Sequence, residues 1–294
     1  MKRTTSVAKE NSSEGAAQSL RAAERVEPAS EIGKKDRQFV VALGRGLQIL
    51  DCFSRSELEL SGTDIAAKLK LPQSTVWRLC RTMVKLGYLE TSGEGRLRPS
   101  LSTLRLGYVP LSNLTITELA RPHLQDLADE IGGAAGLAVR DGSDLRFVER
   151  CESDSKFLMS IRVGSRVPIA MSAIGWAYLA ALPSDEREAT ITEVKPHDKD
   201  LWIRSEAPLR LSLKAFETDG FILTEGLFYP GYVSIAAPVR GPDGMPVLMI
   251  NCGAASSTLA PDLPRSKIGP RVHEVARLLE SVLVSINPKE LHIW

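Results

Sequence analysis

The sequence lacks the residue clusters that bind metal ions or form disulfide frameworks. Its 294 residues include only four cysteines and four histidines. Cys52, Cys80, Cys151 and Cys252 lie far apart, with no CxxC motif and no Cys/His spacing typical of zinc sites. We therefore expect no metal site, and four reduced thiols in the core of a cytoplasmic protein.

The signals of export and membrane insertion are also missing. Met1 to Lys9 is polar and no apolar stretch follows it, so we expect no signal peptide. The longest uncharged run, 167–184, is interrupted by Pro168, Gly175 and Pro183. A bilayer span needs about 20 predominantly apolar residues. This run therefore predicts a loop leading into a buried helix, and no contact with a membrane.

Sequence motifs of common enzymes are absent as well. No GxSxG, GxGxxG, P-loop or HExxH pattern occurs. The histidines are scattered, and only His197 has an adjacent acid, Asp198. We therefore expect that the protein is not an enzyme and that it binds no cofactor. The alternative is a hydrolytic protein whose Ser/His/Asp site is brought together only by folding.

Net charge is nearly zero, but the charge is unevenly distributed. The whole chain carries +1, whereas residues 39–105 contain ten lysines and arginines against six acids, a net of +4. The rest of the chain is therefore net acidic. The chain is long enough for two domains, so this asymmetry indicates a basic nucleic-acid-binding domain attached to a second domain with a different function.

The stretch from Ser61 to Leu86 carries the clearest pattern. Ser61 and Asp64 have the spacing of a capping box, and Leu71-Pro72 ends the short helix that follows it. In the next helix an apolar stripe consists of Val76, Leu79, Cys80 and Met83. The opposite face carries Ser74, Trp77, Arg78, Arg81 and Lys85, and no acid occurs from Gln73 to Leu86. This arrangement predicts a helix-turn-helix whose second helix enters the DNA major groove; a basic surface helix of an ordinary bundle is the alternative.

A short hairpin is expected next. Residues 88–91 and 96–98 have strand character on either side of a turn, Ser92-Gly93-Glu94-Gly95, and would form the wing of a winged helix. With an expected first helix at 39–53, built on Leu43, Leu47, Leu50 and Phe53, this gives a domain over 39–99. The candidate DNA-binding residues are Arg45, Gln73, Ser74, Thr75, Trp77, Arg78, Arg81, Arg96 and Arg98.

Two segments flank this domain. Residues 1–38 are polar and predict a disordered tail. Residues 100–115 are strongly apolar, with Leu101, Leu104, Leu106 and Leu111, and we expect a linker helix that pairs with its copy in a second subunit. Packing of this helix only within its own chain is the alternative.

The remaining residues, 116–294, predict an α+β domain. An amphipathic helix at 116–132 precedes a change to strand periodicity. Strands are expected at 134–140, 145–149, 156–163, 221–224, 232–240 and 246–251. Helices are expected at 172–182, 183–192, 208–217 and 268–286. An antiparallel sheet with helices packed on it accounts for this order.

In its motifs the chain resembles the IclR family of bacterial transcriptional regulators. The resemblance runs from about Phe39 to Pro288. It is carried by Leu43-Gly44-Arg45-Gly46-Leu47, Leu71-Pro72-Gln73-Ser74-Thr75, Leu86-Gly87-Tyr88-Leu89, Val163-Gly164-Ser165-Arg166-Val167-Pro168 and Ile235-Ala236-Ala237-Pro238-Val239. No single piece is specific, but their order and spacing together are.

The resemblance implies a winged helix, a dimerising linker helix and a GAF-like effector-binding domain. It implies binding of a palindromic double-stranded DNA operator by a homodimer or a dimer of dimers, tuned by a small organic acid or aromatic metabolite. Carried over, the effector pocket consists of Met159, Ala173, Ile174, Ser234, Asn251 and Gly253, joined by Thr224 or Glu225. The family often has serine where Gly253 stands. A ligand-sensing protein that does not act through DNA is the remaining alternative.

Overall fold

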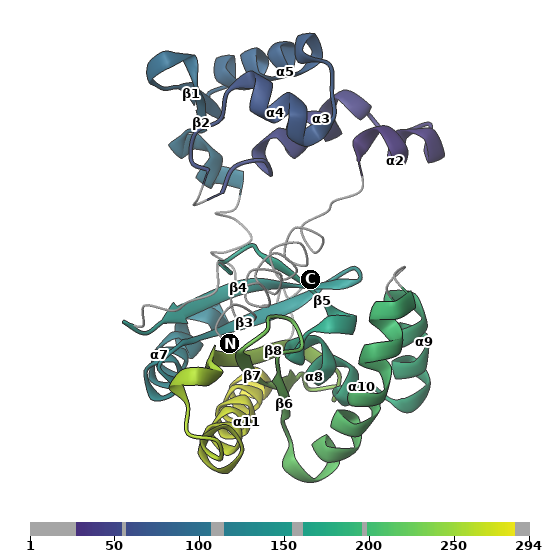
Figure 1. The fold of residues 1–294 in the computed structure, drawn as a ribbon, viewed down its shortest axis with the longest axis vertical. Helices are drawn as coiled ribbons and strands as arrows, with labels where there is room; N and C mark the ends of the chain where they lie inside the picture. The colour runs from purple at the N-terminus through teal and green to yellow at the C-terminus, as the bar shows by residue number, and fades with distance from the viewer. Residues whose placement is uncertain (1–27, 55–56, 107–114, 155–160, 196–198, 286–294) are drawn as a thin grey trace, which may run out of the picture. The chain divides into compact units, whose positions relative to one another are not determined.

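The computed structural model describes residues 28–54, 57–106, 115–154, 161–195 and 199–285 (Figure 1). The chain divides into two compact units, one within residues 25–112 and one made mainly of residues 113–294. The predicted tail residues 1–27, half of the predicted linker (residues 107–114) and Met159 lie outside the described residues.

The first unit is mainly helical and ends in a hairpin. Its elements are α2 (Ala29–Lys35), α3 (Val41–Leu50), α4 (Gly62–Leu69), α5 (Gln73–Lys85), β1 (Leu89–Thr91) and β2 (Leu97–Pro99). Ile49, Ile65, Val76 and Leu89 are almost completely buried, so α3, α4, α5 and β1 each contribute to one small core. This is the predicted helix-turn-helix with its hairpin.

Local sequence chemistry sets the boundaries of α4. Ser61 Oγ accepts the Asp64 N–H at 3.1 Å, and Asp64 Oδ2 accepts the Ser61 N–H at 2.9 Å, which confirms the capping box. Lys70 ends the helix with a φ of 53°, a left-handed conformation. Just before α4, Leu60 forms an isolated bridge with Leu97 of the hairpin.

Two expectations for the beginning of this unit were wrong. Ala29–Lys35 form helix α2, although we expected a disordered tail through Gln38. Ala29 is buried and its N–H is bonded to Gln48 Oε1, so contacts with α3 hold this helix. In α3 the predicted apolar stripe is also not buried as expected, because Leu43 and Leu47 are 64% and 51% exposed.

The second unit is a six-stranded antiparallel sheet with the strand order β5-β4-β3-β8-β7-β6. The strands are β3 (Ala134–Asp141), β4 (Asp144–Glu152), β5 (Arg166–Pro168), β6 (Ile222–Glu225), β7 (Tyr232–Arg240) and β8 (Pro246–Ala255). The helices are α7 (Thr115–Ile131), α8 (Ala173–Ala181), α9 (Ser184–Val194), α10 (Lys199–Asp219) and α11 (Gly269–Ser285). The predicted α+β class is confirmed.

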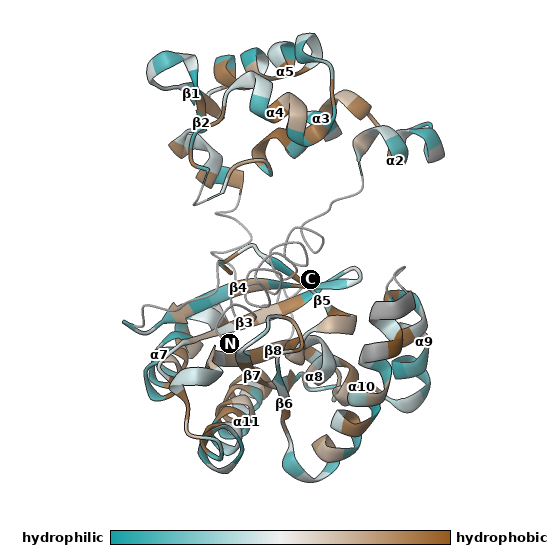
Figure 2. Ribbon diagram, in the orientation of Figure 1, coloured by the Kyte–Doolittle hydropathy of each residue, from teal (hydrophilic) through white to brown (hydrophobic). Residues whose placement is uncertain are grey.

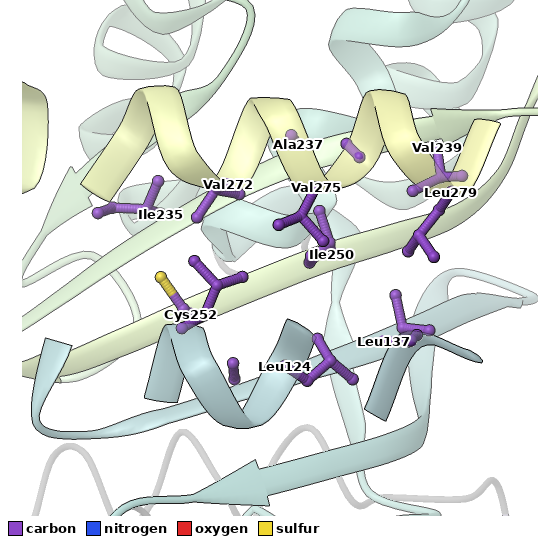
Figure 3. Packing of buried hydrophobic residues seen from close by; sticks show 14 of the residues in the cluster. Leu124, Leu137, Ile235, Ala237, Val239, Ile250, Cys252, Val272, Val275 and Leu279 are labelled. Carbon is purple, nitrogen blue, oxygen red and sulfur yellow. The ribbon is translucent and has the colours of Figure 1, made fainter. Parts of the chain in front are cut away.

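Helices cover both faces of this sheet. On one face, Val272, Val275 and Leu279 of α11 point toward β7 and β8, and Leu124 of α7 joins the same core (Figure 3). On the other face, the fully buried Trp176 of α8 belongs to a second core. Hydrophilic residues are prominent on α9, which is farther from the sheet (Figure 2). The unit thus has three layers.

Other differences from the predicted elements are local. Helix α10 begins at Lys199 and continues through Pro208, where we expected it to start. Ile161–Val163, the described part of the strand expected at 156–163, are not in a strand. The buried helix after the uncharged run is present as α8. No helix in the described part of the chain is long and apolar enough to cross a membrane.

Candidate functional site

Helix α5 presents one apolar and one basic face. Val76, Cys80 and Met83 are buried, as predicted. The predicted opposite face is exposed, namely Ser74, Trp77, Arg78, Arg81 and Lys85. Of the other two candidates, Gln73 is exposed and Thr75 is half-buried. No side chain caps the N-terminus of α5, which follows Pro72. Free N–H groups and the positive end of the helix dipole are thus available to an anionic partner there.

An exposed aromatic ring and an arginine lie side by side on this face. Trp77 is 59% exposed, and Arg81 Cζ lies 5.1 Å from its ring centroid. Gln73 Nε2 donates to Thr63 Oγ1 of α4 at 3.3 Å, so the start of α5 is tied to the preceding helix. The face therefore combines amide, hydroxyl, aromatic and guanidinium groups without any carboxylate.

The other three candidate arginines are either paired with protein groups or partly buried. Arg98 pairs with Glu90 at 2.6 Å and with Glu59 at 3.7 Å, across the base of the hairpin. Arg96 donates to the Glu59 carbonyl at 2.8 Å and lies 3.6 Å from Asp64. Arg45 is half-buried, and its Nε has no hydrogen-bond partner among the described residues. Any phosphate contact by Arg96 or Arg98 would compete with these carboxylates.

The second unit contains a pocket between the sheet and α8. It encloses about 40 Å³ and is lined by five of the predicted effector residues: Ala173, Ile174, Thr224, Ser234 and Asn251. Glu225 is exposed and is not part of its lining. Thr224 is therefore the member of that pair that reaches the pocket. Met159 lies outside the described residues.

Strand register explains how the polar residues meet. Thr224 is paired with Ser234, and Ser234 with Gly253, across three adjacent strands. Asn251 Nδ2 donates to Ser234 Oγ at 2.8 Å. Ser234 thus accepts a hydrogen bond from within the protein, and its own O–H is left to donate to a ligand.

Gly253 contributes space rather than a polar group. A Cβ at this position would lie 2.5 Å from Tyr232 Cε1, so the tyrosine ring occupies the volume of the missing side chain. Gly253 itself does not line the pocket, whereas Tyr232 does. Burial raises the pKa of the Tyr232 phenol to about 12, and the charge of Arg150 together with a side-chain hydrogen bond from it only partly opposes this shift. Its hydroxyl is neutral at physiological pH and can donate a hydrogen bond.

Arg150 is the main pocket residue that our sequence analysis did not identify. It lines the pocket, its side chain is only 5% exposed, and its Nε donates to Glu152 Oε1 at 3.3 Å. Regular alternation with Leu145 and Phe147 would place it on the opposite face of β4. A bulge at Val148 shifts the register, so that Phe147 pairs with Ala138 and Arg150 with Gly136. No sequence signal marks this bulge.

Metal ligands and reactive thiols are the other kinds of site to consider in the described parts of the two units. Within these residues no group of three or more His, Cys, Asp or Glu side chains could hold a metal ion. The four cysteines are free and buried, and burial raises the pKa of Cys52 to about 11. These thiols are therefore poor nucleophiles at neutral pH.

Known proteins match the chain over both units. The family model of the IclR helix-turn-helix domain matches residues 42–93, and that of the C-terminal domain of bacterial IclR transcriptional regulators matches residues 109–280. The HTH-type transcriptional regulator TsaQ1/TsaQ2 of Comamonas testosteroni is 25% identical over 269 residues, which are 90% of this chain and 96% of that protein.

Solved structures agree with this result. An IclR family transcriptional regulator from Brucella abortus is 36% identical, with a TM-score of 0.66 over 84% of this chain and 94% of that one. An IclR homologue from Microbacterium hydrocarbonoxydans, complexed with 4-hydroxybenzoate, is 22% identical, with a TM-score of 0.68 over 83% of this chain and 100% of that one. The latter similarity shows the fold alone.

Proposed function

Because the chain belongs to the IclR family of bacterial transcriptional regulators, we propose that α5 binds the major groove of an operator and that a small metabolite tunes this binding. The observation that carries the DNA part is the exposed, acid-free face of α5. The matched families consist of transcriptional regulators, not enzymes. The proposed division has a DNA-binding domain at 39–99, a linker at 100–115 and an effector domain at 116–294.

The α5 side chains divide by chemistry into two groups. Gln73, Ser74 and Thr75 lie at the N-terminal end of the helix, where short polar groups reach base edges and phosphates. Trp77, Arg78 and Arg81 continue along the groove; arginine can bind guanine bidentately, and the indole can contact a thymine methyl or a sugar. We assign Arg45, Arg96 and Arg98 to the flanking phosphates.

For the effector, the pocket between α8 and the sheet is the proposed site. Ala173 and Ile174 supply an apolar wall, and Thr224, Ser234 and Asn251 supply polar groups. An apolar wall with a few polar groups is typical of small-molecule sites, and with about 40 Å³ the pocket suits a small organic acid, whereas an aromatic metabolite requires it to widen. A protein of the same fold has been solved with 4-hydroxybenzoate, which supports a ligand of this class.

Regulation then follows from thermodynamic linkage. An effector changes operator affinity only if it binds the DNA-competent and the incompetent arrangements of the dimer with different affinity. We place the difference in the linker, between the two proposed domains. A homodimer, or a dimer of dimers, would present two copies of α5 to the two halves of a palindromic operator.

Fluorescence anisotropy tests this proposal. The full chain is titrated with labelled DNA from upstream of the neighbouring operon and with a scrambled duplex, at several salt concentrations. We expect tighter binding to the upstream DNA and a steep fall in affinity with salt, because phosphate contacts release counterions. Three results would instead favour a ligand-sensing protein that does not act through DNA: equal affinity for the two duplexes, an affinity that does not change with salt, or no detectable binding to either duplex.

A further inference from the structure

The pocket contains a buried cation that the protein itself does not fully satisfy. Arg150 Nη2 is buried and has no hydrogen-bond partner among the described residues. The guanidinium donates to the Tyr232 hydroxyl, and its Nε contacts Glu152 at 3.3 Å, but Glu152 makes a shorter contact, 2.6 Å, to Arg162 Nη1. The nearest carboxylate is therefore shared between two guanidinium groups. A buried arginine is costly unless its N–H groups find acceptors, so an acceptor is expected in the pocket.

Aromatic rings and neutral donors surround this cation. Phe147 lies over Gly136, where a Cβ would be 3.0 Å from its ring, and Tyr232 lies over Gly253 in the same way. Arg150 Cζ is 5.8 Å from the Phe147 ring centroid. Two side-chain-free positions thus let two rings lie on the sheet beside the guanidinium. This arrangement offers one positive charge, flat apolar surfaces and the hydroxyls of Tyr232 and Ser234.

We propose that Arg150 binds the carboxylate of the effector, so that this pocket takes a small monocarboxylate whose apolar part lies against Ile161, Ile174 and Phe228. A guanidinium and a carboxylate match in charge and planar geometry, and both partners then have hydrogen bonds. The single arginine sets a preference for one carboxylate group. This inference rests on the proposed effector site, and it adds the residue and the ligand class to it.

Isothermal titration calorimetry with the full chain tests this assignment. The probes are pyruvate and benzoate, each compared with its neutral amide, pyruvamide and benzamide. We expect saturable binding of at least one acid, with more than tenfold tighter affinity than its amide. Arg150→Met should remove the preference for the acid, and Arg150→Lys, which keeps the charge but loses the planar fork, should retain part of it.

Arg146→Gln is the matched control. Arg146 lies on the same strand, pairs with Asp141 at 2.5 Å and does not line the pocket, so this change removes one positive charge while acid binding should persist. Thermal unfolding reports on folding: Glu152 keeps its 2.6 Å contact to Arg162 in Arg150→Met, so this variant should still unfold in one cooperative transition. If Arg150→Met does not fold, Arg150→Lys tests the proposal, because it should bind the acid more weakly than the wild type does.

Two results would overturn the assignment: no saturable binding of either acid, or an unchanged acid preference in Arg150→Met. These outcomes are separate from the DNA proposal, because calorimetry contains no DNA. Acid binding that depends on Arg150, together with no operator binding, would reject only the regulator. Operator binding without acid binding would reject only this inference.

Discussion

Among single residues, Trp77 combines an exposed indole with a contact that orders a neighbouring arginine on the face of α5 proposed to bind DNA. An indole that is 59% exposed gains little from burial within its own unit, yet it holds the Arg81 guanidinium 5.1 Å from its ring centroid. A stacked arginine has fewer rotamers to lose when it binds a ligand. Trp77 therefore positions Arg81 as well as offering its own surface to the groove.

Arg78 provides the sharpest test of the α5 assignment. If it contacts a guanine through two hydrogen bonds, Arg78→Ala should weaken operator binding by about 1–3 kcal/mol. Anisotropy titrations on the upstream duplex measure this loss. Lys85→Ala is the matched control, since Lys85 is an exposed cation in the last turn of the same helix. Equal losses for both variants would indicate general electrostatic attraction and contradict the base contact.

At the scale of elements, the capping box of α4 fixes where the first helix of the helix-turn-helix begins. Ser61→Ala removes the acceptor for the Asp64 N–H and should lower the unfolding free energy of the first unit by about 1 kcal/mol. Urea unfolding followed by circular dichroism measures the change. Ser61→Asn, which keeps a capping oxygen, should stay close to the wild type. A loss of the same size in both variants would mean that the cap is not the cause.

Asp64 adds a pH dependence to the same element. Hydrogen bonds from Ser61 lower the pKa of the Asp64 carboxyl below its ordinary value of 3.8. Its stabilising effect is therefore complete above that value and is lost as the pH falls through the lower, folded pKa. Thermal unfolding between about pH 6 and 2.5 should show a smaller acid-induced loss for Asp64→Asn than for the wild type. Parallel curves would contradict this linkage.

Elements with a complete local signature could be predicted from the sequence. The capping box and the apolar stripe of α5 each lie within a short stretch, and the structure contains both. Features that depend on contacts across the chain could not. The bulge at Val148 brings Arg150 into the pocket, and the contact with Gln48 holds Ala29. Helix α10 passes through Pro208, which would locally favour a helix start, and the adjacent Leu209 is fully buried.

For the whole molecule, the apolar side chains after the hairpin need explanation. Leu101, Leu104 and Leu106 are 84%, 69% and 49% exposed in the single chain. Leu43 and Leu47 of α3 are exposed in the same unit. Each large apolar side chain that becomes buried contributes about 1.5–3 kcal/mol. Pairing of two copies through the linker would bury such surface, which is the physical basis of the proposed homodimer.

Leu104→Glu tests that pairing. A charge at this position would have to be buried in a dimer interface, so we expect the dimer to dissociate at least tenfold more readily in sedimentation experiments. Leu86→Glu is the matched control, because Leu86 is similarly exposed, at 65%, but lies at the end of α5 outside the linker. Operator affinity should fall with the dimer, since one copy of α5 reads only half of a palindrome. A Leu104→Glu protein that sediments like the wild type would show that the linker packs within its own chain.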